Sequence, residues 1–184
     1  MTTIKKWTKL TSRYISKSPW ATLRVDACEL PNGKITNDYY ILEYPNWANA
    51  VAITESNEII LIKQYRHGAD IISLEIPGGV IDGDEDPKDG IKRELLEETG
   101  YLFEDIELIS TIYPNPATSN NITYGFLAKG GKKTQEQALD EHEDIEVSLH
   151  SIEDVKQLLL DNKFPQALHT TALMYAFLKM GVLK

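Results

Sequence analysis

Three glutamates close together in the sequence have the types and spacing best suited to chemistry. Glu94, Glu97 and Glu98 follow an i, i+3, i+4 pattern, so a helix would place their carboxylates on one side within a single turn. Carboxylates this close repel one another when no cation is bound. Magnesium prefers oxygen ligands and binds through a few carboxylates together with the phosphate oxygens of a substrate. The spacing therefore predicts a site for a divalent cation and a phosphate-containing ligand.

The helix that must carry these glutamates has clear start and stop signals. Asp86 is a candidate N-cap, Pro87 takes the first helical position, and Gly100 stands just past the end. Ile91 and Leu95 form a neighbouring apolar stripe that can pack against a sheet. We therefore expect a helix between Pro87 and Gly100 that holds the carboxylates on a fixed support.

Two further features surround this helix. The segment 77–79 (PGG) predicts a sharp turn where backbone can approach a ligand, so that a free carbonyl there could join the metal. Arg93 lies four residues before Glu97, close enough to pair with a carboxylate and fix its orientation. As a surface ion pair alone, this contact would contribute little stability.

The spacing of these residues resembles a known motif. Gly79 is followed by five residues, Glu85, seven residues and then RELLEETG, which reproduces the Nudix box. The chain resembles the Nudix hydrolase family, and one departure is Tyr101, where the family usually has an aliphatic packing residue. The resemblance implies an α/β fold, a Nudix-type α/β/α sandwich in which helices flank a mixed sheet. The box would form its loop-helix-loop unit.

The resemblance also implies the reaction. Nudix enzymes typically hydrolyse a nucleoside diphosphate linked to another group, with metals clamping the pyrophosphate while an activated water attacks phosphorus. The implied cofactor is Mg²⁺, with Mn²⁺ as the alternative. The implied catalytic group contains Glu97, Glu98, Glu141 and Arg93, of which Arg93, like Glu85, would act as a support. The implied metal ligands are Gly78, through its carbonyl, and Glu94, Glu97, Glu98 and Glu143.

Segment 61–79 resembles the ADP-ribose pyrophosphatase branch of the family. There a Gln-x-Arg ends one strand and a Glu-x-Pro-Gly-Gly opens the box; in this chain Gln64, Arg66, Glu75 and Pro77 match. The implied substrate-binding residues include Arg66 and Glu75. Arg66 would hold a substrate phosphate or stack on the base, which suits a planar cation with five donors. A plain surface arginine is the alternative.

The N-terminal residues 12–44 resemble extra strands of the same branch, which commonly exchange between two subunits. We therefore expect an N-terminal β extension over residues 1–45, a Nudix hydrolase domain over 46–184, and a homodimer. Trp20 could stack on adenine in the partner's site, or it could anchor the core or the interface.

Two loops complete the predicted site. Residues 140–145 (DEHEDI) resemble a mobile loop that delivers a carboxylate to the metals, with Glu141 as candidate base and Glu143 as candidate ligand. The choice between these two stays open, as does a merely solvated acidic loop. Pro116 matches a substrate-binding proline of the ADP-ribose pyrophosphatase branch. However, Ala117 replaces the glycine that usually follows it there, and Asn120 or Asn121 stands near the position of a usual glutamate. These departures leave the sugar end of the substrate open.

Composition limits the class of protein. A length of 184 residues fits one domain with a small appended element. A net charge of −9 argues against binding a nucleic-acid backbone. The only cysteine, Cys28, cannot form an internal disulfide, and no apolar run suits a signal peptide or a membrane span. We expect a cytoplasmic protein without nucleic-acid or membrane partners.

Hydrophobic patterns predict the remaining elements. The expected strands cover 21–29, 39–44, 49–54, 58–65, 106–113, 122–128 and 145–148, and the expected further helices cover 151–162 and 167–180. The leading hypothesis is hydrolysis of ADP-ribose to AMP and ribose 5-phosphate. The alternatives are hydrolysis of another nucleotide sugar or a dinucleotide, and a non-catalytic nucleotide sensor on the same fold.

Overall fold

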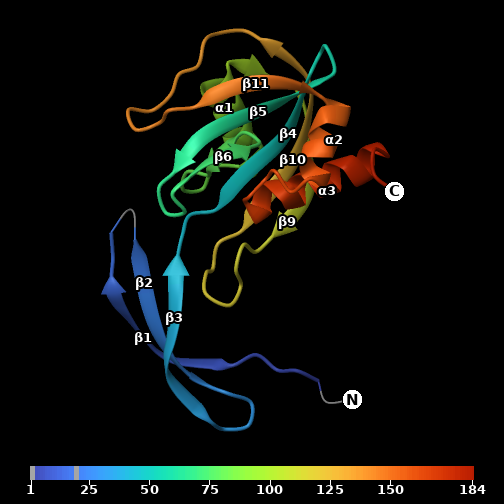
Figure 1. The fold of residues 1–184 in the computed structure, drawn as a ribbon. Coiled ribbons are helices and arrows are strands. Elements are labelled where there is room, and N and C mark those ends of the chain that lie inside the picture. Colours follow the sequence, from blue (N-terminus) through green and yellow to red (C-terminus); the bar gives the residue numbers. More distant parts are fainter. Residues whose placement is uncertain (1–2, 19–20) are drawn as a thin grey trace. The chain divides into compact units, whose positions relative to one another are not determined.

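The computed structural model describes residues 3–18 and 21–184 (Figure 1). These residues divide into two compact units. The smaller unit comprises Met1–Tyr44 and Tyr113–Asn121, and the larger unit comprises Pro45–Ile112 and Ile122–Lys184. Each unit is described below by itself.

The smaller unit is a three-stranded antiparallel sheet. Its strands β1 (Thr8–Ser16), β2 (Thr22–Glu29) and β3 (Ile35–Glu43) lie in sequence order. The loop 113–121 attaches to β3, because the Leu42 N–H donates to the Thr118 carbonyl at 2.7 Å and the Tyr39 hydroxyl donates to the Ala117 carbonyl at 2.8 Å. Large apolar side chains on this unit remain exposed: Trp7, Leu10, Tyr14, Ile15, Ile35 and Tyr40.

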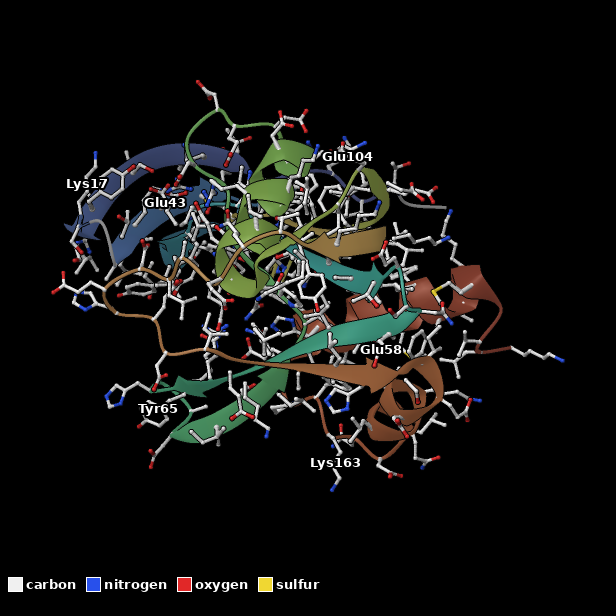
Figure 2. The ribbon with its side chains drawn as sticks, turned by 90° about the horizontal axis from the view of Figure 1, so that it is seen from above. Lys17, Glu43, Glu58, Tyr65, Glu104 and Lys163 are labelled. Carbon is white, nitrogen blue, oxygen red and sulfur yellow. The ribbon has the colours of Figure 1, made fainter. Side chains whose placement is uncertain are left out.

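The larger unit is built on a mixed sheet. Its main path runs β11 (Glu146–Ser151), β5 (Glu58–Arg66), β4 (Trp47–Thr54), β10 (Thr123–Lys133) and β8 (Tyr101–Leu102). Three further strands pair with this path: β6 (Ile71–Glu75) with β5, β7 (Gly78–Val80) with β4, and β9 (Asp105–Ile112) with β10. Strands β4 and β10 are parallel and the other pairs are antiparallel. Figure 2 shows the side chains, with Glu58 and Tyr65 near opposite ends of β5.

Helices cover both faces of this sheet. Successive strand residues point to opposite faces, so Val51 and Ile53 of β4 join the core beneath α2 (Ile152–Leu160) and α3 (Ala167–Met180). The alternate positions, Ala48, Ala50 and Ala52, join the core beneath α1 (Pro87–Thr99). Figure 1 shows α1 across the sheet from α2 and α3. The predicted α/β class with a mixed sheet between helices is confirmed.

Helix α1 begins and ends where its capping residues predict. The Asp86 carboxylate accepts from the Lys88 N–H at 2.8 Å, and Pro87 opens the helix. Gly100 is left-handed, with φ of 73°, and its N–H donates to the Leu96 carbonyl. Ile91 and Leu95 are fully buried against the sheet. The apolar stripe therefore fixes the opposite, glutamate-bearing face.

Several element boundaries differ from the expectations. Strands β6, β7 and β8 were not predicted, because each is only two to five residues long. Strand β3 begins at Ile35 rather than residue 39, and β10 continues to Lys133 through a register shift near Gly131. Helix α3 has the predicted bounds, and α2 begins after its N-cap Ser151. Along 3–18 and 21–184, no helix is long and apolar enough to cross a membrane.

Candidate active site

Two glutamates of α1, Glu98 and Glu94, lie against the turn at residues 78–79, and Glu97 is the most exposed of the three. Glu98 is 3% exposed, and its Oε2 accepts from the Gly78 N–H at 2.8 Å. The Glu94 side chain is 13% exposed and that of Glu97 is 42% exposed. The structure thus brings Gly78 together with Glu98; we call Glu94, Glu97 and Glu98 the box carboxylates.

The two glycines of the turn make this close approach feasible. A Cβ at Gly78 would clash with the backbone of Ala48 and Asn49, where β7 pairs with β4. A Cβ at Gly79 would lie 2.5 Å from the Glu94 carboxyl carbon. Any side chain at residue 79 would therefore displace Glu94. Close pairing with β4 therefore requires the glycine at residue 78, and packing of the Glu94 carboxylate requires the one at residue 79.

Arg93 holds the outer part of this cluster. Its Nη1 donates to Glu94 Oε1 at 2.9 Å and to Glu97 Oε2 at 3.0 Å. Its Nη2 donates to Glu85 Oε2 at 3.2 Å and to the Val80 carbonyl at 3.1 Å. The hydrogen bond to Glu85, above all, raises the pKa of Arg93 and lowers that of Glu85. One arginine therefore orients three carboxylates, which is more than the single ion pair that spacing alone indicated.

The box carboxylates carry more negative charge than Arg93 neutralises. Burial, followed by the charges of Glu94 and Glu143, raises the pKa of Glu98 to about 8, against the stabilising Gly78 N–H. Burial likewise raises the pKa of Glu94, with the charges of Glu97 and Glu143 acting in the same direction despite Arg93. Such mutual repulsion is relieved by a cation. No three potential metal ligands in the described residues already converge on one point, so the fit to a cation rests on this charge and on the oxygen donors.

The acidic loop contributes Glu143 to the same electrostatic environment. Glu141 and Glu143 are both exposed, and the loop turns where the Glu143 N–H donates to the Asp140 carbonyl at 3.0 Å. Gln137, which sequence reasoning missed, anchors the start of this loop. Its Nε2 donates to the Glu98 carbonyl at 2.8 Å and to the Ile145 carbonyl at 3.0 Å. A lone glutamine in a polar stretch gives no sequence signal for such a role.

Arg66 and Glu75 form a second cluster, on the β5–β6 hairpin. Arg66 Nε donates to Glu75 Oε1 at 2.8 Å and Arg66 Nη2 to Glu75 Oε2 at 2.6 Å. The Gln64 amide also donates to Oε2 at 3.2 Å, and His169 Nε2 of α3 lies 3.3 Å from it. Burial alone would raise the pKa of Glu75, but hydrogen bonds from Arg66 and His169 bring it to about 2. Sequence reasoning missed His169, whose only signal was its place in an otherwise apolar stretch.

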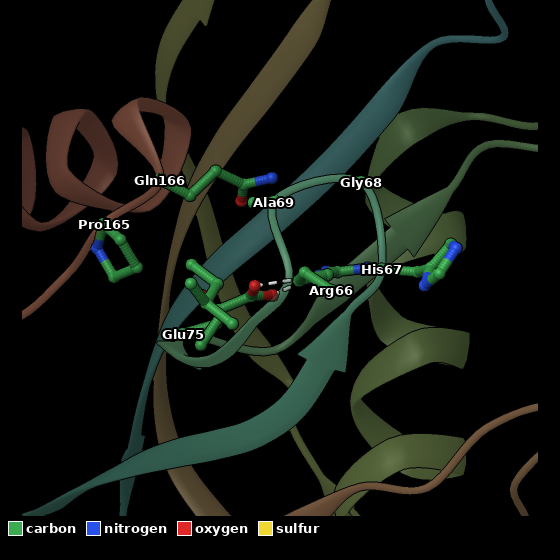
Figure 3. A pocket seen from close by; sticks show the side chains of 9 residues that line it. Arg66, His67, Gly68, Ala69, Glu75, Pro165 and Gln166 are labelled. Atoms are coloured by element: carbon green, nitrogen blue, oxygen red, sulfur yellow. Dashed lines mark hydrogen bonds and ion pairs between the residues drawn. The ribbon is translucent and has the colours of Figure 1, made fainter.

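A pocket lies beside this second cluster. It has a volume of about 340 Å³, and Figure 3 shows Arg66 and Glu75 on one side with Pro165 and Gln166 opposite. The charges of Glu98 and Glu143 also act on Arg66, raising its pKa after the larger effect of Glu75. Arg66 therefore experiences the charge of Glu98, one of the box carboxylates, and also lines the pocket.

Two predicted substrate contacts cannot be placed with these clusters. Trp20 lies outside the described residues. Pro116 belongs to the smaller unit, in the loop that attaches to β3. Their predicted roles stay predictions.

Comparisons with known proteins cover most of the chain. Residues 44–172 match the NUDIX domain, and residues 7–42 match the nucleoside diphosphate sugar hydrolase N-terminal domain. The chain is 34% identical to the ADP-ribose pyrophosphatase of Bacillus subtilis (strain 168) over 85% of each chain. It is 32% identical to the methanol dehydrogenase activator of Bacillus methanolicus over 83% of each. A crystal structure of an ADP compounds hydrolase has the same fold, with a TM-score of 0.86, 22% identity and full coverage of both chains.

Proposed function

The chain belongs to the Nudix hydrolase family, and from this we propose that it hydrolyses ADP-ribose to AMP and ribose 5-phosphate. Its enzyme class, without the specific substrate, is that of a pyrophosphohydrolase of the ADP-ribose or ADP-sugar pyrophosphatase type. The observation that carries the proposal is the presence of two clusters: acidic box carboxylates on α1, and Arg66, which lines a pocket and experiences the charge of Glu98. Such a site suits a pyrophosphate with a group attached at each end.

The box residues would hold the cation. Nudix enzymes generally use a divalent metal, usually Mg²⁺, with Mn²⁺ as the alternative here. The proposed ligands are the Gly78 carbonyl, Glu94, Glu97, Glu98 and Glu143. When bound, the cation neutralises pyrophosphate charge and makes water a better nucleophile.

The chain's own groups then orient the reactants. Arg93 holds Glu94 and Glu97 side by side through its Nη1, and the Gly78 N–H fixes Glu98. Arg66, held in plane by Glu75, binds a phosphate of the substrate. Glu141 accepts a proton from the attacking water. The water oxygen bonds to phosphorus as the bridging P–O bond breaks, and the bridging oxygen leaves with the other phosphate. Glu143 is the alternative base, and its electrostatic contact with the box keeps that alternative open.

The N-terminal extension, residues 1–45, is proposed to complete the site of a second subunit. The smaller unit leaves large apolar side chains exposed, as expected of a sheet that a second copy covers. Trp20 would supply a ring for the base. Light scattering should find a homodimer, and a monomer at micromolar concentration would contradict this part of the proposal.

A second substrate class has specific support. The chain is 26% identical to the GDP-mannose pyrophosphatase of Yersinia pestis (strain Pestoides F) over 85% of each chain. Ala117 also departs from the glycine of ADP-ribose enzymes, so another nucleotide sugar or a dinucleotide is the alternative. A changed loop can redirect sugar specificity without altering pyrophosphate chemistry.

A substrate panel tests the proposal. The purified protein is given ADP-ribose, GDP-mannose, NADH, diadenosine polyphosphates and nucleoside triphosphates at one Mg²⁺ concentration, and products are separated by chromatography. ADP-ribose is expected to have the highest kcat/KM and to yield AMP. Any other substrate that exceeds it about tenfold would replace ADP-ribose in the proposal. No turnover of any compound would favour a nucleotide sensor.

A further inference from the structure

His169 is a buried histidine of α3 whose ring reaches the Arg66–Glu75 cluster. It is 5% exposed, and its Nε2 lies 3.3 Å from Glu75 Oε2. Its Nδ1 has no hydrogen-bond partner among residues 3–18 and 21–184. Burying a bare ring nitrogen costs free energy, which an apolar side chain of similar size would avoid. The contact with Glu75 therefore gives the histidine a role beyond packing.

Glu75 receives donors from two separate parts of the fold. Gln64 and Arg66 lie two residues apart on β5, on the face that Glu75 shares across the β5–β6 pair. Both belong to the same hairpin as Glu75 and move with it. His169 instead comes from α3, on the covering layer of helices. Of the four polar contacts that this carboxylate makes within residues 3–18 and 21–184, the histidine contact alone ties it to the helix layer.

The orientation of Glu75 determines that of Arg66. The carboxylate uses both oxygens on the Nε and Nη2 edge of the guanidinium, and Nη1 remains outside this contact. Arg66 is 42% exposed, lines the pocket and experiences the charges of Glu98 and Glu143. A rotation of the buried carboxylate would therefore move the exposed guanidinium relative to the box.

We propose that His169 is a positioning residue, which fixes the Glu75 carboxylate and through it the Arg66 guanidinium that binds substrate phosphate. The inference rests on the proposed function only for the identity of the phosphate compound. Because Arg66 would bind phosphate in the ground state and in the transition state alike, loss of its position should raise KM more than it lowers kcat.

Three variants of residue 169 test this role. Gln places a side-chain N–H near the position of histidine Nε2, whereas Asn is too short and Leu has no donor. His169→Leu and His169→Asn should raise KM for ADP-ribose about tenfold, with kcat changed less than about threefold. His169→Gln should recover most of the loss. Because Gln and Asn are both polar, their comparison remains informative if His169→Leu does not fold.

A double-mutant cycle with Arg66→Ala separates positioning from general stability. If His169 acts through Arg66, His169→Asn should have little further effect on KM in the Arg66→Ala background. The matched control is Thr170→Val on the same helix as His169. It removes the hydrogen bond from Thr170 Oγ1 to the Phe164 carbonyl, 3.1 Å away. This control should lower the melting temperature without changing KM.

The outcomes are distinct. Equal KM effects of His169→Asn with and without Arg66, or no recovery by Gln, would overturn the positioning role. If the wild-type protein hydrolyses no nucleotide, the proposed function fails instead. The same cycle is then measured as ADP binding by calorimetry, where a coupling between residues 66 and 169 supports the inference and additivity refutes it.

Discussion

Arg93 and Arg66 both bind glutamates, but they do so in opposite environments. Arg93 meets Glu85, Glu94 and Glu97, so one cation faces three carboxylates that are partly exposed. Arg66 meets one carboxylate, Glu75, which is 1% exposed and also contacts His169. The Arg93 cluster therefore keeps surplus negative charge, whereas the Arg66 cluster is balanced.

This difference indicates a division of roles. Surplus negative charge attracts a cation, and Arg93 holds the carboxylates in place without cancelling them. A balanced cluster cannot bind a cation in the same way, but it presents a rigid guanidinium to an anion. A pyrophosphate with its metal needs both kinds of partner. The following predictions test whether the two clusters differ in this manner.

The largest effect is expected at Glu98, the buried box carboxylate that lies on the same helix as Arg93 and is held by the Gly78 N–H. Glu98→Gln removes the charge that a cation would use but retains the side-chain shape, so kcat should fall by about 10³ or more. Circular dichroism and the elution volume should be unchanged. Turnover close to the wild-type value in saturating Mg²⁺ would refute a metal role for Glu98.

The loop glutamates should show the next largest effect. A positioned base contributes about 10²- to 10⁴-fold, so Glu141→Gln should lose that much in kcat with little change in KM. Glu143→Gln should mainly raise the Mg²⁺ concentration needed for half-maximal activity, because Glu143 acts electrostatically on Glu94 and Glu98. If Glu143→Gln has the larger effect on kcat and leaves the Mg²⁺ requirement unchanged, the two roles are reversed.

Removal of each arginine should affect different kinetic constants. Arg66→Ala should raise KM roughly 10- to 100-fold, because it removes charge-assisted hydrogen bonds to substrate. Arg93→Ala should instead lower kcat and weaken Mg²⁺ dependence, since Glu94 and Glu97 lose their orientation. Steady-state kinetics over a matrix of substrate and Mg²⁺ concentrations separates the two. Similar changes in both variants would contradict the division of roles.

The smallest effect is on the free energy of unfolding. Its contribution from Glu98 should fall as pH rises, whereas its contribution from Glu75 should fall as pH falls. Without metal, the raised pKa of Glu98 means that its contribution is present below pH 4.5 and is lost as pH rises toward about 8. The lowered pKa of Glu75 means that its contribution is present above pH 4.5 and is lost as pH falls toward about 2. Urea unfolding across pH 3–8 measures both. Glu98→Gln should remove the loss of stability at high pH. If the free energy of unfolding changes with pH in the same way in the wild type and the variant, the raised pKa of Glu98 is refuted.

Local sequence predicted the Arg93 cluster well, and its residues show why. The i, i+3, i+4 spacing of the glutamates depends only on helix geometry, and the caps at Asp86 and Gly100 are local contacts. Arg93 and its partners Glu94 and Glu97 are at most four residues apart, which is about one helical turn. The hydrogen bond from the Gly78 N–H to Glu98 spans 20 residues and was not predicted, because the family resemblance implied only that the Gly78 carbonyl would join the metal.

The Arg66 cluster was predicted only in part. Arg66 and Glu75 were identified by resemblance to one branch of the family, but their mutual bidentate contact was not, because it depends on the register of β5 against β6. Strand β6 itself lacks the length and alternation that identify a strand in sequence. The short β7 was missed for the same reason.

The α/β class with a mixed sheet was implied by the family resemblance. By itself the sequence determined the α1 helix, its capping residues and the face that carries the glutamates. These features depend on periodicity and on contacts within a turn, which the order of residues specifies directly. Only the tertiary structure decided that Glu98 would be buried against Gly78, that Glu143 would act on the box, and that His169 would meet Glu75. These contacts join segments far apart in the chain, so they depend on strand register and on how α3 packs over the sheet.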